Sequence, residues 1–170
     1  MNFIKFDTRV SKRIILCAVI LMAAAAVFAN ELVVGQAAPD FTFMSAVPAK
    51  QQKLSDYRGK PVALHFWAAW CGPCVRELPL ISALSSSKSD DITVLAVNCG
   101  ETDRYVSSFL SKRKLRLNIV MDRDSSISAL YNIDAIPQTF MIDADGIIRS
   151  IRVGSYTKTE LDRDVSAMIK

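Results

Sequence analysis

The sequence is poor in the side chains that hold soft metal ions. Its 170 residues include one histidine, His65, and four cysteines, of which only Cys71 and Cys74 are closely spaced. A structural zinc ion usually takes four ligands. Because no second cysteine pair accompanies Cys71 and Cys74, the sequence disfavours a zinc knuckle, and we expect no bound metal.

The sequence also has little excess positive charge. The net charge is +4, and all but +1 of it lies in the first thirteen residues. Binding to a phosphate backbone requires a dense surface of lysine and arginine, so we expect no nucleic-acid partner. The one basic segment, 112–116, is interpreted as a solvated helix end, with a docking patch for an acidic partner as the alternative.

No apolar run reaches about 20 residues, the length that normally crosses the hydrocarbon core of a membrane. The longest run, 14–28, follows a basic start and ends beside the small residue Ala29, which is the layout of a secretory signal. We predict a signal peptide over 1–29 and one domain over 30–170, exported to the periplasm or another extracytoplasmic space. The alternative is an uncleaved leader that associates the domain with the membrane.

Export places the mature chain where thiols tend to be oxidised. The cysteines after the leader form one close pair, Cys71 and Cys74, with Cys99 left over. A domain of this size holds its core without disulfides, so the pair is free for chemistry. We expect Cys99 to be a buried inert thiol, with a regulatory disulfide to Cys71 or Cys74 as the alternative.

The order of the predicted elements indicates a mixed α/β sandwich. Residues 62–67 form an apolar run without alternation, which is typical of a strand covered on both faces, and helices are expected on either side. A turn at 143–146, Asp-Ala-Asp-Gly, predicts a terminal antiparallel hairpin. Residues 35–59 are interpreted as a turn-rich extension, with a turn of helix or a hairpin at 54–58. The remaining predicted elements are helix 72–86, strand 92–97, helix 102–113, strand 118–121, helix 125–131, strand 139–142, strand 147–153 and helix 158–169.

The cysteine pair follows the buried strand and opens a helix. At a helix start, unpaired backbone amides and the positive end of the dipole favour the thiolate of Cys71, which can attack a disulfide. Cys74 lies one turn later and can attack the resulting mixed disulfide. Pro73 has no amide hydrogen to leave unpaired at this position. The segment therefore predicts a redox-active dithiol.

These features resemble the thioredoxin superfamily, and within it the extracytoplasmic ResA and TlpA branch. The specific match is 66–74, Phe-Trp-Ala-Ala-Trp-Cys-Gly-Pro-Cys, and weaker matches lie at 38–41, 77–79, 97–101 and 136–140. The resemblance implies a thioredoxin-like three-layer sandwich with a mixed central sheet. It also implies a protein disulfide oxidoreductase whose redox centre is the Cys71–Cys74 disulfide, with no other cofactor.

The resemblance further implies which residues meet a client protein. It assigns the client-binding surface to Trp70, Gly72, Pro73, Ile136 and Pro137. A cis peptide between Ile136 and Pro137 is expected to face the dithiol, where the backbone of Ile136 pairs with an extended client segment.

Two further residues are catalytic candidates. Glu77 lies three residues after Cys74, so the two side chains are neighbours on a helix. A carboxylate there would raise the pKa of the Cys74 thiol and relay its proton, as the resemblance also implies; a surface glutamate is the alternative. His65 stands where thioredoxin has a buried, proton-accepting aspartate. It is either the base that activates Cys74 or a core histidine with satisfied hydrogen bonds.

The Gly-Pro pair between the cysteines resembles the reducing members of the superfamily, near about −270 mV for thioredoxin against about −120 mV for the oxidant DsbA. We expect a monomeric reductant of protein disulfides, with apocytochrome c as a candidate client. Its electron donor by resemblance is a membrane thiol reductase of the DsbD or CcdA kind.

Two alternatives stay open on the same fold. A peroxiredoxin-like peroxidase is disfavoured because the Pro-X-X-X-Thr-X-X-Cys pattern is absent. A copper-binding assembly factor is disfavoured because no histidine follows Cys74.

Overall fold

The computed structural model describes residues 31–46, 49–88 and 90–169. The signal peptide predicted over 1–29 lies outside the described residues. Leu32–Lys170 forms one compact unit that carries all the elements below. In this part of the chain, no helix combines the length and apolar character needed to cross a membrane.

The core of the unit is a five-stranded mixed sheet with the strand order β5-β4-β3-β6-β7. The strands β3, β4 and β5 run parallel, whereas β6 pairs antiparallel with β3 and β7. The sheet therefore ends in the predicted antiparallel hairpin. The strands are β3 (Val62–Trp67), β4 (Thr93–Cys99), β5 (Asn118–Asp122), β6 (Gln138–Ile142) and β7 (Ile148–Val153).

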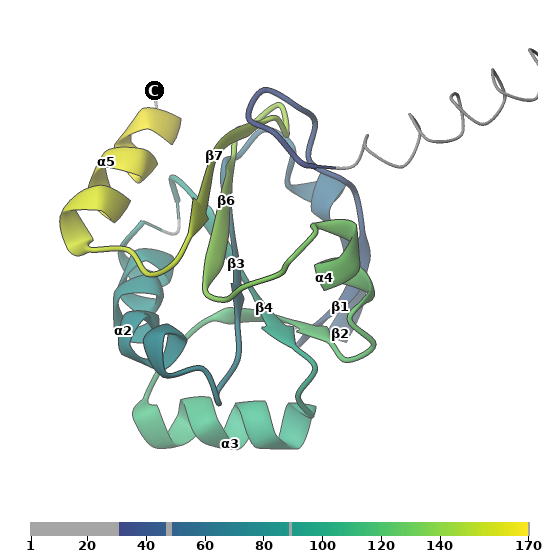
Figure 1. The fold of residues 1–170 in the computed structure, drawn as a ribbon, viewed down its shortest axis with the longest axis vertical. Helices are drawn as coiled ribbons and strands as arrows, with labels where there is room; N and C mark the ends of the chain where they lie inside the picture. The colour runs from purple at the N-terminus through teal and green to yellow at the C-terminus, as the bar shows by residue number, and fades with distance from the viewer. Residues whose placement is uncertain (1–30, 47–48, 89, 170) are drawn as a thin grey trace, which may run out of the picture. The chain divides into compact units, whose positions relative to one another are not determined.

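Both faces of the sheet are covered, which is why every residue of β3 is buried. Figure 1 shows α2 (Gly72–Ser87) and α5 (Lys158–Met168) on one side, and α4 (Ser126–Leu130) with the hairpin β1 (Thr42–Ala46)–β2 (Ala49–Lys53) on the other. The helix α3 (Asp103–Arg113) packs beside α2 through a cluster that includes Trp67 and Phe109. The predicted three-layer arrangement is therefore confirmed.

Alternate residues of β3 enter different cores. Leu64 and Phe66 pack with α4 and the N-terminal hairpin, whereas Ala63 and Trp67 pack beneath α2, α3 and α5. Because successive strand residues point to opposite faces, His65 lies on the face that α2 covers. The fold thus places the one polar residue of this strand under the helix that carries the cysteine pair.

The N-terminal region differs most from the sequence prediction. The sequence pattern predicts no strand before residue 62, yet β1 and β2 form a two-stranded antiparallel sheet. Its second strand, Ala-Lys-Gln-Gln-Lys, is almost entirely polar, so no apolar alternation indicated it. The short 3-10 helix η1 (Leu54–Tyr57) confirms the helical turn at 54–58 rather than a hairpin there. Other boundaries shift by one or two residues, and β4 extends past Val97 to Cys99.

Candidate active site

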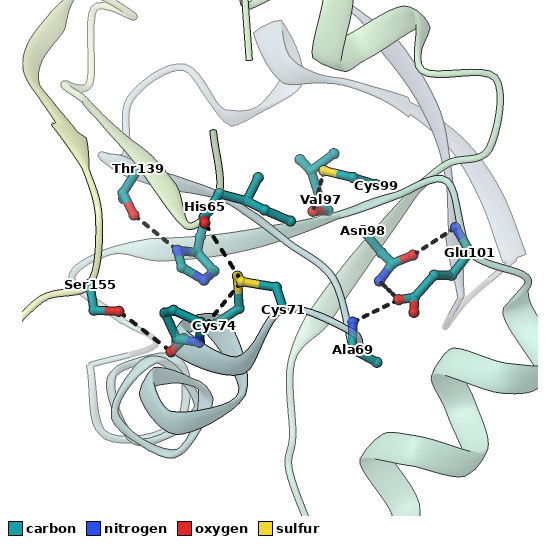
Figure 2. The surroundings of a disulfide bond; sticks show 12 residues. His65, Ala69, Cys71, Cys74, Val97, Asn98, Cys99, Glu101, Thr139 and Ser155 are labelled. Atoms are coloured by element: carbon teal, nitrogen blue, oxygen red, sulfur yellow. Dashed lines mark hydrogen bonds between the residues drawn. A yellow bond between two sulfur atoms is a disulfide. The ribbon is translucent and has the colours of Figure 1, made fainter. Parts of the chain in front are cut away.

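The cysteine pair lies at the start of α2, a few residues after β3 ends. Cys71 is the N-cap of α2, and its sulfur accepts a hydrogen bond from the backbone N–H of Cys74 at 3.2 Å. The two cysteines form a disulfide, drawn in Figure 2. Cys71 is 5% exposed, whereas Cys74 is fully buried. An incoming sulfur can therefore reach Cys71 and not Cys74.

The strand β6 brings a proline loop to the same place. The Ile136–Pro137 peptide is cis, and the carbonyl oxygen of Ile136 lies 3.6 Å from the sulfur of Cys71. Pro137 is buried and Ile136 is half-buried. The proline loop therefore places a backbone carbonyl next to the sulfur of Cys71.

The surface around Cys71 is apolar and open. Trp70 is 70% exposed, the largest exposed fraction among the bulky apolar side chains of the described residues, and Gly72 and Pro73 are exposed beside it. Together with Ile136, these residues leave apolar surface uncovered next to the reactive sulfur. Such surface on a protein marks a place for a partner.

A loop between β7 and α5 holds the parts of the site together, and sequence reasoning missed it. The N–H of Gly154 donates to the carbonyl of Pro137 at 2.8 Å, and the hydroxyl of Ser155 donates to the carbonyl of Pro73 at 3.4 Å. The N–H of Tyr156 donates to the carboxylate of Glu77 at 2.8 Å. Three consecutive residues thus join the proline loop to the first turns of α2. No local signal in the sequence could reveal bonds between residues so far apart.

Glu77 is buried in this network. It is 4% exposed, so the alternative of a surface glutamate is wrong. Burial raises the pKa of its carboxyl, while the N–H of Tyr156 and the charge of Arg152 act in the opposite direction. The helix places Glu77 three residues after Cys74, and the carboxylate accepts a hydrogen bond from the N–H of Tyr156.

His65 is fully buried beneath the disulfide. Its Nδ1 lies 2.9 Å from the hydroxyl oxygen of Thr139, which faces it from β6. Its Nε2 has no hydrogen-bond partner among the described residues. Burial lowers the pKa of the imidazole to about 4, so the ring is neutral at pH 7. The structure thus leaves one ring nitrogen of a neutral base without a partner close to the cysteine pair.

A second network supports the chain just before Trp70. The carboxylate of Glu101 accepts from the N–H of Ala69 at 2.9 Å and from the side-chain amide of Asn98 at 2.6 Å (Figure 2). Asn98 is fully buried at the end of β4. A polar Asn in an apolar strand, followed three residues later by an acid, is the sequence signal that points to this network.

Cys99 lies away from the disulfide. It packs against the core on the opposite face of the sheet, where the hydroxyl of Ser128 lies 3.6 Å from its sulfur. Burial is the main cause that raises the pKa of its thiol. These contacts favour an inert thiol over a disulfide with Cys71 or Cys74. Among the residues that the structure describes, no group of three or more metal-ligating side chains gathers at any point.

We predict that His65 makes stability depend on pH between about 4 and 6.5. The pKa of a histidine in an unfolded chain is about 6.5, whereas burial lowers the pKa of His65 to about 4. The unfolded chain therefore takes up this proton first as the pH falls. The contribution is complete above about pH 6.5 and declines towards pH 4, by up to about 3 kcal/mol. Denaturant unfolding of the wild type and the His65→Asn variant measures it, because shared carboxylates cancel in the difference. Parallel profiles over this range would contradict the prediction.

Comparison with known proteins agrees with this geometry. A model of the AhpC/TSA family matches residues 34–151. The chain is 38% identical over 136 residues to the thiol-disulfide oxidoreductase ResA of Geobacillus kaustophilus, a match that covers 79% of this chain and 78% of the relative.

Solved structures agree as well. The crystal structure of StoA from Bacillus subtilis has a TM-score of 0.66 at 27% identity and covers 76% of this chain and 98% of its own. A secreted disulfide oxidoreductase of Mycobacterium tuberculosis has a TM-score of 0.66 at 26% identity and covers 75% and 95%. With the cysteine pair at the head of α2, the chain is a thiol-disulfide oxidoreductase with a thioredoxin-like fold and belongs to the AhpC/TSA family.

Proposed function

We propose that the protein reduces disulfides of exported proteins through Cys71 and Cys74. The observation that carries this proposal is the unequal exposure of the two sulfurs at the start of one helix. Cys71, with 5% of its surface exposed, faces the Ile136 carbonyl, and Cys74, with none exposed, lies behind it. This arrangement supports attack by one cysteine and resolution by the other.

The two steps balance as follows. The thiolate of Cys71 attacks one sulfur of a client disulfide, forming a mixed disulfide and releasing the other client sulfur as a thiolate. The thiolate of Cys74 then attacks the sulfur of Cys71, which breaks the mixed disulfide and releases the second client sulfur. Two electrons pass to the client, and the Cys71–Cys74 disulfide remains.

The surface around the dithiol supports a protein client. Trp70, Gly72, Pro73 and Ile136 offer exposed or half-buried backbone and apolar side chains around Cys71. In this proposal an extended client segment lies against the backbone of Ile136, whose place is fixed by Pro137. Regeneration of the dithiol then requires an electron donor, for which we propose a membrane thiol reductase.

Export is part of the proposal. The basic, apolar and small-residue order of 1–29 supports a signal peptide, and one of the structural relatives is a secreted protein. An exported reductase works against an oxidising environment, which supports the need for a dedicated donor. Maturation of apocytochrome c is a process in which such a reductant would serve.

We predict that replacing Cys71 and replacing Cys74 affect disulfide reduction in different ways. Replacement Cys71→Ser should lower the rate of disulfide reduction by at least about a thousandfold, because the attacking sulfur is lost. Replacement Cys74→Ser should instead accumulate a mixed disulfide with a model client, seen by mass spectrometry without reductant. The matched control, Cys99→Ser, should keep the wild-type rate. Full activity of Cys71→Ser, or loss of activity in Cys99→Ser alone, would rule out the assignment.

The direction of electron flow follows from the reduction potential of the Cys71–Cys74 couple. We expect a value below about −220 mV, on the reducing side of protein disulfide isomerase and DsbA. Equilibration with glutathione buffers of known ratio, followed by alkylation and mass spectrometry, measures it. A potential near about −120 mV would show an oxidant and overturn the reductase proposal.

We propose that Glu77 acts on Cys74 through its charge. In a Cys71→Ser/Cys99→Ser background, Cys74 is the only site thiol, and its thiolate is followed by ultraviolet absorbance. Glu77→Gln keeps an oxygen for the N–H of Tyr156 but removes the carboxylate, so the pKa of Cys74 should fall. The surface change Asp162→Asn is the control and should leave this pKa unchanged. An unchanged pKa in Glu77→Gln would limit Glu77 to a structural role.

A further inference from the structure

The strand β6 supplies a second residue to the site beyond its proline. Thr139 lies two residues after Pro137 and is opposite His65 in the antiparallel register of β6 and β3. Its side chain is almost fully buried, and its hydroxyl oxygen lies 2.9 Å from Nδ1 of His65. Among the described residues, the hydroxyl of Thr139 has one hydrogen-bond partner, the imidazole of His65.

The other side of the imidazole faces the cysteine pair. Figure 2 shows the ring of His65 between Thr139 and the disulfide, with Nδ1 turned to Thr139 and the second nitrogen on the disulfide side. That nitrogen, Nε2, is buried without a hydrogen-bond partner in the described part of the chain. A buried polar atom of this kind needs a reason, because leaving it unpaired costs free energy.

The structure holds the cysteines as a disulfide, and only the reduced protein has thiols that could bond to this nitrogen. A neutral imidazole carries its proton on one nitrogen and presents a lone pair on the other. If Nδ1–H donates to Thr139, Nε2 is a bare acceptor towards the cysteines. If the Thr139 hydroxyl donates to Nδ1 instead, Nε2 carries the proton and cannot take another. The hydroxyl of Thr139 therefore decides whether His65 can serve as a base.

We propose that Thr139 is a positioning residue that accepts Nδ1–H of His65 and so presents a bare Nε2 to Cys74. This inference rests on the proposed function and deepens it. During resolution, Nε2 takes the proton from the thiol of Cys74, and the resulting thiolate attacks the sulfur of Cys71. The bond between Cys71 and the client breaks, and the proton returns from His65 to the client thiolate that leaves. Thr139 keeps its hydrogen bond to Nδ1–H throughout, because the imidazolium still carries that proton.

The neighbourhood contains few competing groups. On α2 and its N-cap the titratable groups are Cys71, Cys74, Arg76 and Glu77. Arg76 is exposed, and the carboxylate of Glu77 accepts a hydrogen bond from the N–H of Tyr156. The residues of α3 that pack into this face are apolar, and β4 places Ala96 opposite His65. Burial accounts for the lowered pKa of the imidazole, so no charged side chain acts strongly on it.

The protein offers a clean way to test this inference, because His65 is its only histidine. Nitrogen NMR of histidine-labelled reduced protein reports which ring nitrogen carries the proton, without assignment ambiguity. We expect the proton on Nδ1 in the wild type and in Thr139→Ser. In Thr139→Val, which has nearly the same shape but no hydroxyl, we expect a shift towards the Nε2–H tautomer. A wild-type ring protonated on Nε2 would overturn the proposal.

The kinetic arm separates this role from packing. General bases contribute about 10²–10⁴ in rate, so Thr139→Val should slow resolution of a preformed mixed disulfide by about tenfold or more at pH 7. Thr139→Ser should restore the rate, and in a His65→Asn background the change Thr139→Val should have no further effect. The rate at which Cys71 first attacks a client is measured in the same variants and shows whether the slowing is confined to resolution. Equal resolution rates in Thr139→Val and wild type, or a first attack slowed as much as resolution, would refute the role of Thr139, whereas absence of the first attack in the wild type would refute the proposed function instead.

Discussion

The burial of β3 on both faces is the constraint on which the site depends. Because helices and the N-terminal hairpin cover the two sides, the strand ends at a fixed point, and the chain that leaves it enters α2 without a long loop. Cys71 thereby becomes the N-cap, where backbone amides and the helix dipole favour an anionic sulfur. The same burial removes His65 from water, so its hydrogen-bond partners must lie inside the protein. The position of Cys71 and the environment of His65 therefore both follow from the burial of β3.

The rigidity of the site comes from bonds between distant segments. Ala69 is held by Glu101, and the loop at Gly154–Tyr156 is bonded to both the proline loop and α2. A reacting group keeps its geometry better when packed helices and strands hold it and hydrogen bonds support its neighbours than when it lies on a free loop. The exposed surface near Trp70 is therefore open to a partner while the two sulfurs stay in place.

The parts that sequence reasoning predicted correctly are those with local causes. The unbroken apolar run of β3, the turn at 143–146 and the Gly-Pro pair at the head of α2 all act within a few residues, and each predicted its element. The burial of Glu77 and the bond to Tyr156 depend on contacts across about half the chain, which no periodicity encodes. The prediction missed β2 for another reason. This strand lies at the surface, so its side chains carry no apolar pattern.

A histidine under the dithiol changes the electrostatics of exchange in a definite way. A buried aspartate is charged before it accepts a proton and neutral afterwards, whereas His65 is neutral first and cationic afterwards. Burial lowers the pKa of His65 to about 4, so the imidazole is neutral at pH 7. In the proposed resolution step the imidazole becomes charged only when Cys74 ionises, and its proton then lies beside the thiolate that it attracts. In a medium of low dielectric that attraction offsets part of the cost of forming two buried charges. As the proposed base, His65 is therefore charged only during the step that uses it.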